Sequence, residues 1–368
     1  MNENFEIFLV VAPGLEDALM SEVLEKGFAN PQKLAGGVQF EGGWEDVWRA
    51  NLELRGATRV LARVGAFRAF HLAQLDKRAR KFDWATVLRP EVPVRVEAVC
   101  RKSKIYHAKA AAQRVERAIT EALGAPISQE AEIVLKVRIE DDLCTFSIDT
   151  SGEALHKRGF KVAVGKAPMR ENLAALFLRE CGYNGSEPVL DPMCGSGTFI
   201  VEAAEIAMGL MPGRERSFAF ENLASFDAKR WQKMREDHQS KAIAVTFTGF
   251  DRDSGAISNS RKNADRAGVG EYTTFTMQPI SEAAPPEGPA GLVILNPPYG
   301  GRIGNKKLLY ALYGTMGKVL KERFKGWRVG IITNERDLAY ATGLPLEAGP
   351  VVDHGGIKVR LYKSAPLN

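Results

Sequence analysis

The second half of the chain repeatedly places a short apolar segment before a longer segment with helical periodicity. Strands are expected at Glu187–Asp191, Val245–Asp251, Tyr272–Met277, Gly291–Leu295 and Trp327–Thr333, with a closing antiparallel strand at Gly356–Lys363. Helices are expected at Thr198–Met208, Gly255–Ala267 and Lys306–Phe324. Repeated strand–helix units build a mostly parallel sheet, because each helix returns the chain across the face of the sheet. The pattern predicts an α/β fold from about residue 166 onward.

The first 150 residues mix shorter strands and helices. Strands are expected at Phe5–Val11, Val38–Phe40, Val60–Phe67, Val92–Val99, Ile133–Glu140 and Leu143–Asp149, and helices at Leu15–Gly27, Trp44–Leu54 and Lys109–Leu123. This arrangement predicts two small α+β units. We interpret His156–Lys161 as a strand that is too polar for a core and connects to the α/β part. Residues 210–244 are interpreted as an insertion between the first helix and the second strand of that part.

Composition excludes several classes of protein. A chain of 368 residues with 45% hydrophobic and 26% charged residues is typical of a soluble protein with more than one core. Its apolar runs are shorter than the roughly 20 residues of a membrane helix, and its acidic amino end argues against a secretory signal. The cysteines (Cys100, Cys144, Cys181, Cys194) form no C-x-x-C pair and the histidines show no ligand spacing. We therefore expect a cytoplasmic protein with neither disulfide framework nor metal site.

Positive charge is concentrated in the middle of the chain. Residues 63–117 carry 14 Lys and Arg against 5 Asp and Glu, whereas residues 1–60 carry 5 against 10. A basic segment beside a nearly neutral half indicates a polyanionic partner, most simply nucleic acid. The alternative is an ordinary solvated face.

The loop from Asp191 to Thr198 (DPMCGSGT) follows the first predicted strand of the α/β half and opens a helix. Its glycines, Gly195 and Gly197, let the backbone approach a ligand at the carboxyl edge of the sheet, where such folds bind cofactors. The spacing D-x-x-x-G-x-G is that of S-adenosylmethionine methyltransferases. The alternative without a ligand is a tight strand–helix turn.

Two other nucleotide-binding motifs fit less well. A phosphate-binding P-loop requires G-x-x-x-x-G-K-[ST], and the segment Val164–Ala167 fails in spacing and in its last residue. A dinucleotide fingerprint requires a third glycine at the position where this chain has Ile200. It also requires an acid about 20 residues onward, whereas the acid that ends the second strand, Asp251, lies much farther along the chain. The methyltransferase interpretation is the one that remains.

Asp251 ends the second strand of the α/β half. A carboxylate one strand after the glycine loop can accept hydrogen bonds from both hydroxyls of a ribose. An acid at a strand end is otherwise often the N-cap of the following helix.

The sequence Asn296-Pro297-Pro298-Tyr299 ends the apolar fourth strand, at the same sheet edge as the glycine loop. Two prolines hold extended geometry and leave their carbonyls free to accept hydrogen bonds. Together with the Asn296 side-chain carbonyl they suit a planar exocyclic amine, and Tyr299 offers a face on which a base can stack. An ordinary rigid turn is the alternative.

These motifs occur with several others along nearly the whole chain: Pro13–Glu16, Thr150–Gly152, Leu155–Phe160, Ala167–Leu173, Asp191–Thr198 and Asn296–Gly301. In this combination the chain resembles the bacterial ribosomal RNA guanine-N2 methyltransferases that carry a THUMP RNA-binding domain. The resemblance implies a ferredoxin-like unit at residues 1–60, a THUMP domain at 61–155 and a Rossmann-like class I methyltransferase domain at 156–368. Its sheet is expected to be mostly parallel and seven-stranded.

The resemblance also implies a reaction and a set of site residues. Methyl is transferred from S-adenosyl-L-methionine to N2 of a guanosine in structured RNA, with 23S ribosomal RNA as the first candidate. The candidate cofactor contacts are Asp191, Cys194, Gly195, Gly197, Thr198, Asp251, Gln278 and Asn296. Gln278 departs from the family, which usually has an acid facing the adenine amine at this position, although a glutamine carbonyl can still accept from that amine.

The expected catalytic group is Asn296, Pro297, Pro298 and Tyr299, with the amide and proline carbonyls accepting from the target amine and the tyrosine stacking on the extruded base. The phosphates are expected to contact Arg101, Lys102, Lys104 and Lys109. The alternatives are a transfer RNA guanine-N2 methyltransferase, an adenine-N6 DNA methyltransferase, and a non-catalytic RNA-binding assembly factor.

Overall fold

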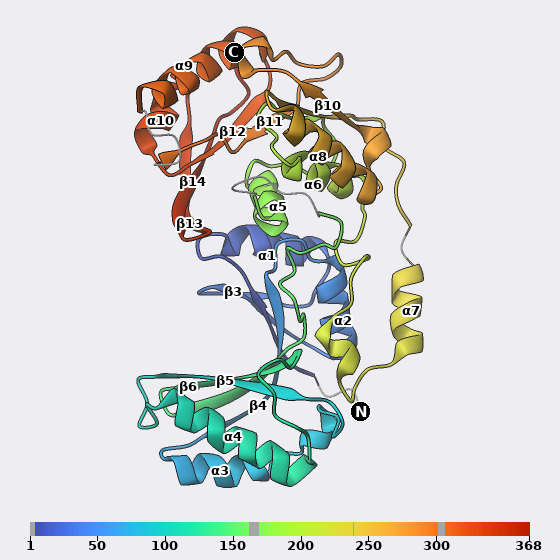
Figure 1. Ribbon diagram of the computed structural model, residues 1–368, viewed down its shortest axis with the longest axis vertical. Helices are drawn as coiled ribbons and strands as arrows, with labels where there is room; N and C mark the ends of the chain where they lie inside the picture. Colours follow the sequence, from blue (N-terminus) through green and yellow to red (C-terminus); the bar gives the residue numbers. More distant parts are fainter. Residues whose placement is uncertain (1–3, 162–168, 238, 301–305) are drawn as a thin grey trace. The chain divides into compact units, whose positions relative to one another are not determined.

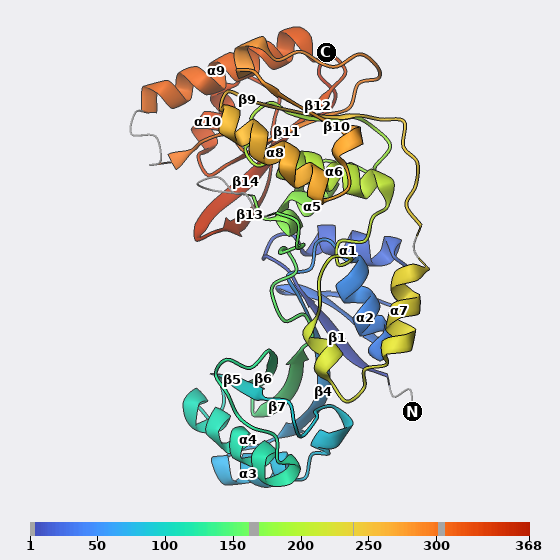
Figure 2. The ribbon, with the colours of Figure 1, turned by 45° about the vertical axis from the view of Figure 1, so that its right-hand side comes forward.

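The computed structural model describes residues 4–161, 169–237, 239–300 and 306–368. Val164–Ala167, Pro168, His238 and Gly301 lie outside these residues. The described chain divides into two compact units. Figures 1 and 2 show the chain with colours that follow its sequence. Unit 1 holds residues 4–11, 20–155 and 216–237, and unit 2 holds the described parts of 12–19, 156–215 and 239–368. No helix in the described part of the chain is long and apolar enough to cross a membrane.

Unit 1 is built on one seven-stranded sheet of order β2-β3-β1-β4-β7-β6-β5. The strands are β1 (Phe5–Val10), β2 (Gln32–Leu34), β3 (Gly37–Gly42), β4 (Arg59–Arg68), β5 (Val94–Arg101), β6 (Ile133–Glu140) and β7 (Leu143–Asp149). Only the pair β5–β6 is parallel among the described neighbours. Strand β4 pairs with β1 on one side and β7 on the other, so the two predicted α+β units share a sheet. The domain boundary at residue 60 stays a prediction.

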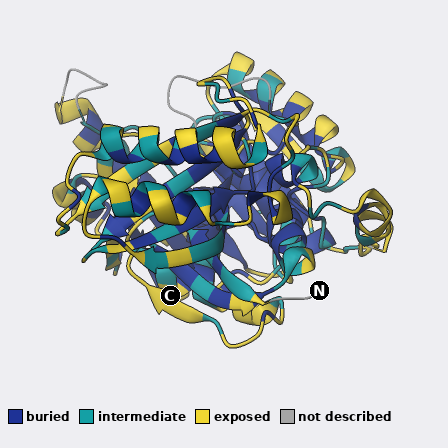
Figure 3. Ribbon diagram, turned by 90° about the horizontal axis from the view of Figure 1, so that it is seen from below, coloured by how far each residue is buried: buried dark blue, intermediate teal, exposed yellow. Residues whose placement is uncertain are grey.

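The helices in this part of the sequence are α1 (Glu16–Glu25), α2 (Trp44–Glu53), α3 (Leu72–Arg80) and α4 (Ala108–Leu123), with a 3-10 turn η1 (Trp84–Thr86). Figure 3 shows helices along which buried and exposed residues alternate. In α4 the buried residues Ala111, Val115, Ala118 and Ile119 recur at helical spacing and form one apolar face. The opposite face of α4 carries its charged side chains in solvent.

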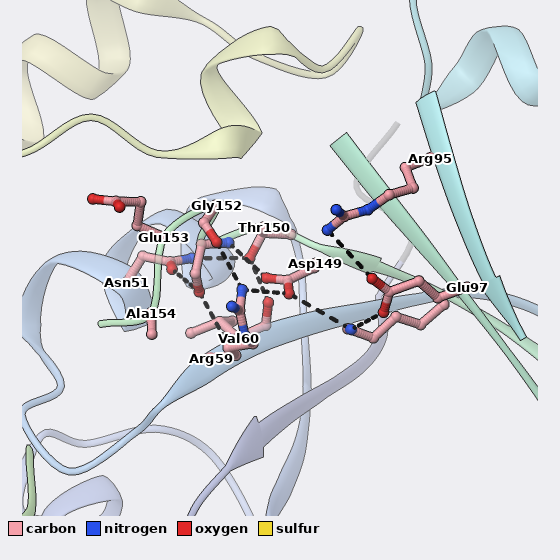
Figure 4. A network of polar contacts seen from close by, with 12 residues as sticks. Asn51, Arg59, Val60, Arg95, Glu97, Asp149, Thr150, Gly152, Glu153 and Ala154 are labelled. Carbon is pink, nitrogen blue, oxygen red and sulfur yellow. Dashed lines mark hydrogen bonds and ion pairs between the residues drawn. The ribbon is translucent and has the colours of Figure 1, made fainter. Parts of the chain in front are cut away.

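Polar contacts in Figure 4 join the start of β4 to the chain that follows β7. Arg59 Nη1 donates to Asp149 Oδ2 at 2.7 Å. Thr150 Oγ1 donates to the Val60 carbonyl at 2.7 Å, and Ser151 Oγ accepts from the Val60 amide at 2.9 Å. The Ser151 hydroxyl gives the buried Val60 amide a partner, whereas the Val60 carbonyl accepts from both the hydroxyl and the amide of Thr150. The Thr-Ser-Gly motif seen in the sequence therefore has a structural role in unit 1.

Unit 2 contains a second seven-stranded sheet, of order β10-β9-β8-β11-β12-β14-β13. Its strands are β8 (Val189–Asp191), β9 (Phe247–Asp251), β10 (Thr273–Met277), β11 (Leu292–Leu295), β12 (Arg328–Thr333), β13 (Glu347–His354) and β14 (Ile357–Lys363). The first five in chain order are parallel to one another, whereas β14 is antiparallel to both β12 and β13. This confirms the Rossmann-like, mostly parallel seven-stranded sheet and the antiparallel closing strand.

The helices of unit 2 are α5 (Glu171–Glu180), α6 (Thr198–Met208), α8 (Ser254–Arg266), α9 (Lys306–Arg323) and α10 (Arg336–Ala341), with 3-10 turns η3 (Gly270–Tyr272) and η4 (Ile280–Glu282). All four residues of β11 are buried, as is typical of a central parallel strand covered on both faces. The order of the strands reverses at β8, where β9 lies on one side and β11 on the other. Ligands bind at such reversal points in open α/β sheets, at the carboxyl ends of the strands.

The predicted insertion divides between the units. Its residues 216–237 belong to unit 1 and contain the 3-10 turn η2 (Ala219–Asn222) and helix α7 (Ala228–Glu236). Phe220 stacks on Trp48 with ring centroids 6.0 Å apart, and Trp231 packs edge-on against Phe220 at 5.0 Å. The insertion therefore adds an aromatic cluster to the core of unit 1.

The segment His156–Lys161 is irregular instead of the predicted strand, and it is not too polar for a core. Phe160 is 4% exposed and Arg158 is 1% exposed. The Arg158 guanidinium lies 3.3 Å from a carboxylate oxygen of Glu202, which is fully buried in α6. Burying this cation is tolerated because its partner is buried with it. The interpretation of the segment as excluded from the core was wrong for this reason.

Candidate active site

The glycine loop connects β8 to α6. Gly195 has φ 54° and Gly197 has φ 78°, and both values lie in the left-handed region that favours glycine. A Cβ on Gly197 would lie 3.1 Å from Phe275 and from Ser260, so a larger residue would crowd the loop. A Cβ on Gly195 would meet no described heavy atom within 4 Å, which leaves that side of the loop open to a ligand.

Two polar residues of α8 hold the glycine loop, and the sequence analysis did not identify either of them. Ser260 Oγ donates to the Gly195 carbonyl at 2.8 Å, and Asn263 Nδ2 donates to the Ser196 carbonyl at 3.0 Å. Both side chains are buried, at 0% and 2% exposure. The available signal was two polar residues three positions apart, and therefore on one face of the predicted helix Gly255–Ala267. They fix the loop in place before any ligand arrives.

Cys194 and Thr198 flank the glycines and are themselves largely buried. The Cys194 amide donates to the Phe250 carbonyl at 2.8 Å, which ties the loop to the end of β9. Its Sγ lies 3.8 Å from Ser260 Oγ, and burial raises the pKa of its thiol well above the ordinary value. A buried, protonated thiol is inert. The backbone of Cys194, rather than its sulfur, therefore positions the loop.

Asp251 lies beside the glycine loop at the end of β9. Its Oδ2 accepts from the Gly195 amide at 3.0 Å, and its Oδ1 accepts from the Asp253 amide at 3.0 Å. Each carboxylate oxygen has room for a second hydrogen bond, and the side chain is half-buried rather than sealed from solvent. The N-cap of α8 is Asp253, which accepts from the Ala256 amide at 2.9 Å. The alternative that Asp251 is only a helix cap is therefore wrong.

Asp191 ends β8 and is 2% exposed. Its Oδ1 accepts from the Met193 amide at 3.0 Å. Burial, with a smaller contribution from the nearby Asp251 charge, raises the pKa of this carboxyl well above its ordinary value. The carboxyl would regain its charge most easily beside a cationic group, because an opposite charge favours the ionised form.

Gln278 follows β10 and contacts this part of the site through its backbone. Its amide donates to the Asp251 carbonyl at 2.9 Å. Its side-chain Nε2 donates to the Glu282 carbonyl at 2.7 Å, which fixes the amide with its nitrogen toward η4. Its contact with an adenine amine stays a prediction.

The Asn296 loop follows β11, and the register of β11 with β8 brings both loops to the carboxyl edge of the sheet. The side-chain oxygen of Asn296 is buried and accepts no hydrogen bond from any described residue. An unpaired buried carbonyl costs about 1–3 kcal/mol, so this acceptor is suited to a donor supplied from outside the chain. Pro297 is buried, and the Pro298 carbonyl accepts from the Tyr313 hydroxyl at 3.4 Å.

Tyr299 packs inside unit 2. It is 5% exposed, and its hydroxyl lies 3.3 Å from Nδ1 of His354, at the end of β13. The structure thus buries the tyrosine, with its hydroxyl beside the β13–β14 hairpin. Its stacking on a base stays a prediction.

The site residues fit S-adenosylmethionine by their chemistry. The open side of Gly195 allows close approach to the backbone, Asp251 retains acceptors for ribose hydroxyls, and the buried Asp191 suits a cationic group. No cluster of three or more His, Cys, Asp or Glu that could hold a metal ion occurs among the described residues.

Comparison with known proteins yields two family matches. Residues 158–346 match the family described as RMKL-like, methyltransferase domain. Residues 6–61 match the RlmL ferredoxin-like domain. The first match alone covers half of the chain.

Individual relatives agree with these matches. The chain is 33% identical over 352 residues to the ribosomal RNA large subunit methyltransferase K/L of Psychromonas ingrahamii, covering 92% of this chain and 47% of the relative. It spans about half the length of that curated relative.

Two crystal structures superpose on nearly the whole chain. One is a predicted N6-adenine-specific DNA methylase of Listeria monocytogenes, with a TM-score of 0.88, 30% identity, and 99% of this chain and 97% of that chain covered. The other is SMU.472, crystallised with SAH, with a TM-score of 0.88, 28% identity and both chains covered completely.

Proposed function

The chain belongs to the RMKL-like methyltransferase family, whose cofactor is S-adenosyl-L-methionine, and on this premise we propose that it methylates the exocyclic N2 amine of a guanosine in RNA. We propose 23S ribosomal RNA as its substrate. The relative from Psychromonas ingrahamii, which acts on large subunit ribosomal RNA by its name, supports this choice. The concentration of cationic side chains in residues 63–117 supports a polyanionic substrate.

The observation that carries the proposal is the buried side-chain oxygen of Asn296, which accepts no hydrogen bond from any residue that the structure describes. Buried acceptors are almost always paired, so an exception requires an explanation. A target amine has two N–H donors, and the Asn296 oxygen would satisfy one of them. The Pro297 carbonyl would accept the other N–H. Proline has no backbone N–H that could compete for this position.

The chain's own residues would contribute positioning and charge stabilisation. S-adenosylmethionine supplies an electrophilic methyl group, so the protein has mainly to orient the amine. Hydrogen bonds from the amine to the Asn296 and Pro297 oxygens would withdraw its lone pair from conjugation with the base and aim it at the methyl. Transfer would break the bond between the methyl carbon and sulfur, which would leave as a neutral thioether while the carbon–nitrogen bond forms. Positive charge would then develop on nitrogen, where the same oxygen dipoles would stabilise it. The extra proton then leaves to water.

Each cofactor contact would be made by a group described above. The ribose hydroxyls would donate to the free acceptor positions of Asp251, and the amino group of the methionine moiety would pair with Asp191. Gly195 and Gly197 would let the backbone approach the cofactor closely, with Cys194 and Thr198 holding the ends of the loop. The side chain of Gln278 remains a candidate acceptor for the adenine amine.

A second candidate is adenine-N6 methylation of DNA, favoured by the description of the Listeria monocytogenes neighbour. The acceptor pair at Asn296 and Pro297 would suit the adenine amine equally well, because that amine is also planar and exocyclic. A transfer RNA guanosine is a third candidate, which the same chemistry would accept.

The product distinguishes these candidates. The full chain would be incubated with S-adenosylmethionine carrying a labelled methyl group and, separately, with undermodified ribosomal RNA, transfer RNA and unmethylated DNA. Digestion to nucleosides and mass spectrometry should give N2-methylguanosine from the 23S ribosomal RNA. Labelled N6-methyladenine from DNA, or label in transfer RNA alone, would overturn the proposed substrate.

A further inference from the structure

Tyr106, in the loop between β5 and α4, is 84% exposed. It is the most exposed large apolar side chain among the described residues, and it lies within the basic segment of unit 1. Other exposed apolar residues lie on strand β5 (Val99, 50%), before α3 (Phe70, 41%) and at the start of β7 (Leu143, 41%). An aromatic ring so fully exposed to water contributes little to folding, and its face is available to bind a ligand.

The backbone on both sides of Tyr106 is anchored. Ile105 is 3% exposed and inserts its side chain into the core. His107 is the N-cap of α4, and its Nδ1 accepts from the Ala110 amide at 3.2 Å. The exposed ring therefore projects from a chain segment whose two neighbouring residues are fixed. Such an arrangement reduces the entropy that a ring loses when a ligand binds it.

The loop is also linked to the turn between β6 and β7. The Lys104 amide donates to Asp142 Oδ1 at 2.7 Å, and the Asp142 amide donates to Ser103 Oγ at 3.0 Å. The Ala69 amide, at the end of β4, donates to the Asp142 carbonyl at 3.0 Å. Three loops that are far apart in the sequence thus form one connected surface, which we call the β5–α4 surface: residues 68–71, 99–109 and 140–143.

Cations and aromatic rings are interleaved on this surface. The Lys104 ammonium lies 4.8 Å from the centre of the Phe70 ring, within the range of a cation–π contact. The exposed cations are Arg68, Arg101, Lys102, Lys104 and Lys109, against the three acids Glu140, Asp141 and Asp142. The acids nearby are partly used within the surface, since Asp142 accepts from the Lys104 amide and Glu140 pairs with Arg138. Positive charge therefore exceeds negative charge around Tyr106.

From this arrangement we propose that the β5–α4 surface binds unpaired nucleotides of the RNA, with a base stacked on Tyr106 and phosphates near the surrounding cations. This inference rests on the proposed function. Bases in a duplex already stack on each other and show only their edges, whereas an unpaired base can place its face on an exposed ring. Charge favours RNA over an apolar protein partner, because such a partner would have to bury these cations without compensation.

The test measures binding of RNA by the full chain without methyl transfer. Its result therefore does not depend on which atom of the RNA is methylated. The full chain is titrated into a labelled single-stranded oligoadenylate of about ten nucleotides, a length typical of single-strand sites, and into duplex RNA with the same number of phosphates. Four variants are compared with the parent chain: Tyr106→Ala, Tyr106→Leu, Tyr106→Phe and the control Tyr340→Ala. Tyr340 is also exposed, at 48%, and also has an arginine 5.0 Å from its ring, but it lies in unit 2.

Tyr106→Ala and Tyr106→Leu should each weaken binding of the single strand about tenfold, the loss expected for one stacked base. Tyr106→Phe and Tyr340→Ala should change it less than twofold, and duplex binding should change little in any variant. Thermal unfolding should be unaltered, because an 84% exposed ring contributes little to the core. Unchanged single-strand binding by Tyr106→Ala would overturn the inference. Equal losses of affinity for the single strand and the duplex would also overturn it. Parent-level binding of the single strand by Tyr106→Leu would overturn it too, because that result would indicate an apolar contact in place of stacking.

Discussion

The amide of Gly195 donates to Asp251 Oδ2 across 3.0 Å, joining two residues that are 56 positions apart in the sequence. This hydrogen bond makes the glycine loop and the end of β9 one structure. It also orients the carboxylate, because the Asp253 amide holds the other oxygen. The proposed cofactor site is thus pre-organised by the backbone.

Gly197→Ala should disturb the loop. The left-handed conformation costs alanine about 1–2 kcal/mol, and the new Cβ would also lie 3.1 Å from Phe275 and Ser260. Gly268→Ala is a matched control, since Gly268 has φ 74° and a Cβ there meets no described atom within 4 Å. In denaturant unfolding, Gly197→Ala should lose about 1 kcal/mol more of the free energy of unfolding than Gly268→Ala. In calorimetry, only Gly197→Ala should bind the cofactor more weakly. Equal behaviour of the two variants would show that crowding of the loop is unimportant.

Asp191→Asn should change the pH dependence of stability and of cofactor binding. The pKa of Asp191 is raised in the folded chain. The protonated carboxyl therefore stabilises the fold fully at pH values below the unfolded pKa of about 3.9. This stabilisation is lost as the pH rises through the folded pKa. The asparagine variant should therefore be the more stable chain at neutral pH, but should gain nothing in acid.

Cofactor binding should respond in the opposite direction. Affinity of the parent chain should rise with pH as Asp191 ionises, while Asp191→Asn should bind about 10- to 100-fold more weakly at neutral pH and without this rise. Thermal unfolding and calorimetry between mildly acidic and neutral pH would measure both effects. Destabilisation by asparagine at neutral pH would contradict a raised pKa.

The strand–helix periodicity sufficed to predict most of unit 2, and the glycine loop, Asp251 and Asn296 were placed at the correct sheet edge. Strand β13 was not predicted, because it is mostly exposed, contains Pro350 and is irregular between Ala348 and Val351. Helix α5 was missed for the opposite reason: eight of its residues are buried, so no polar face reveals its period.

Contacts between distant segments could not be predicted from local patterns. Gly249 is a clear case, because a Cβ there would lie 2.6 Å from Phe275 and 3.1 Å from Cys194 Sγ, on two other segments. The roles of Ser260 and Asn263 also depend on where α8 packs. Local sequence specifies an element and its inner face, but not the carbonyl that a buried polar side chain will meet.

Arg158→Met should destabilise unit 2 strongly. The variant removes the guanidinium that pairs with the buried Glu202 carboxylate, and breaking a buried ion pair typically costs about 3–5 kcal/mol. The double variant Arg158→Met, Glu202→Leu should recover much of the loss, since both charges are then absent. Arg230→Met is the control, because Arg230 pairs with Glu45 at 2.6 Å but both side chains are more than half exposed. Its cost should stay below about 1 kcal/mol, and denaturant unfolding that fails to separate the two pairs would contradict the account.

Replacement of Arg101, Lys102, Lys104 and Lys109 by glutamine should weaken RNA binding. The four side chains are exposed and should act through phosphates, so affinity should fall for all RNA sequences alike. Titration at several salt concentrations should show a shallower slope of log affinity against log salt, by about 0.7 for each single-strand phosphate that is no longer neutralised. An unchanged slope would show that RNA binds elsewhere.

The central claim is that Asn296 accepts from the target amine whereas Asp251 binds the cofactor. Asn296→Ala should reduce methyl transfer about a hundredfold or more while leaving cofactor affinity nearly unchanged. Asp251→Ala should mainly weaken the cofactor, about tenfold or more for each hydrogen bond to a charged acceptor that is removed. Asn296→Asp tests the acceptor itself, because it retains an oxygen at the same position.

The most direct measurement is single-turnover methyl transfer to undermodified 23S ribosomal RNA, at saturating S-adenosylmethionine, for the parent chain and both alanine variants. Calorimetric cofactor binding would be measured on the same preparations. The account predicts that saturation with cofactor restores the rate of Asp251→Ala substantially but leaves that of Asn296→Ala at about a hundredth of the parent rate or lower. Near-normal turnover by Asn296→Ala would contradict it.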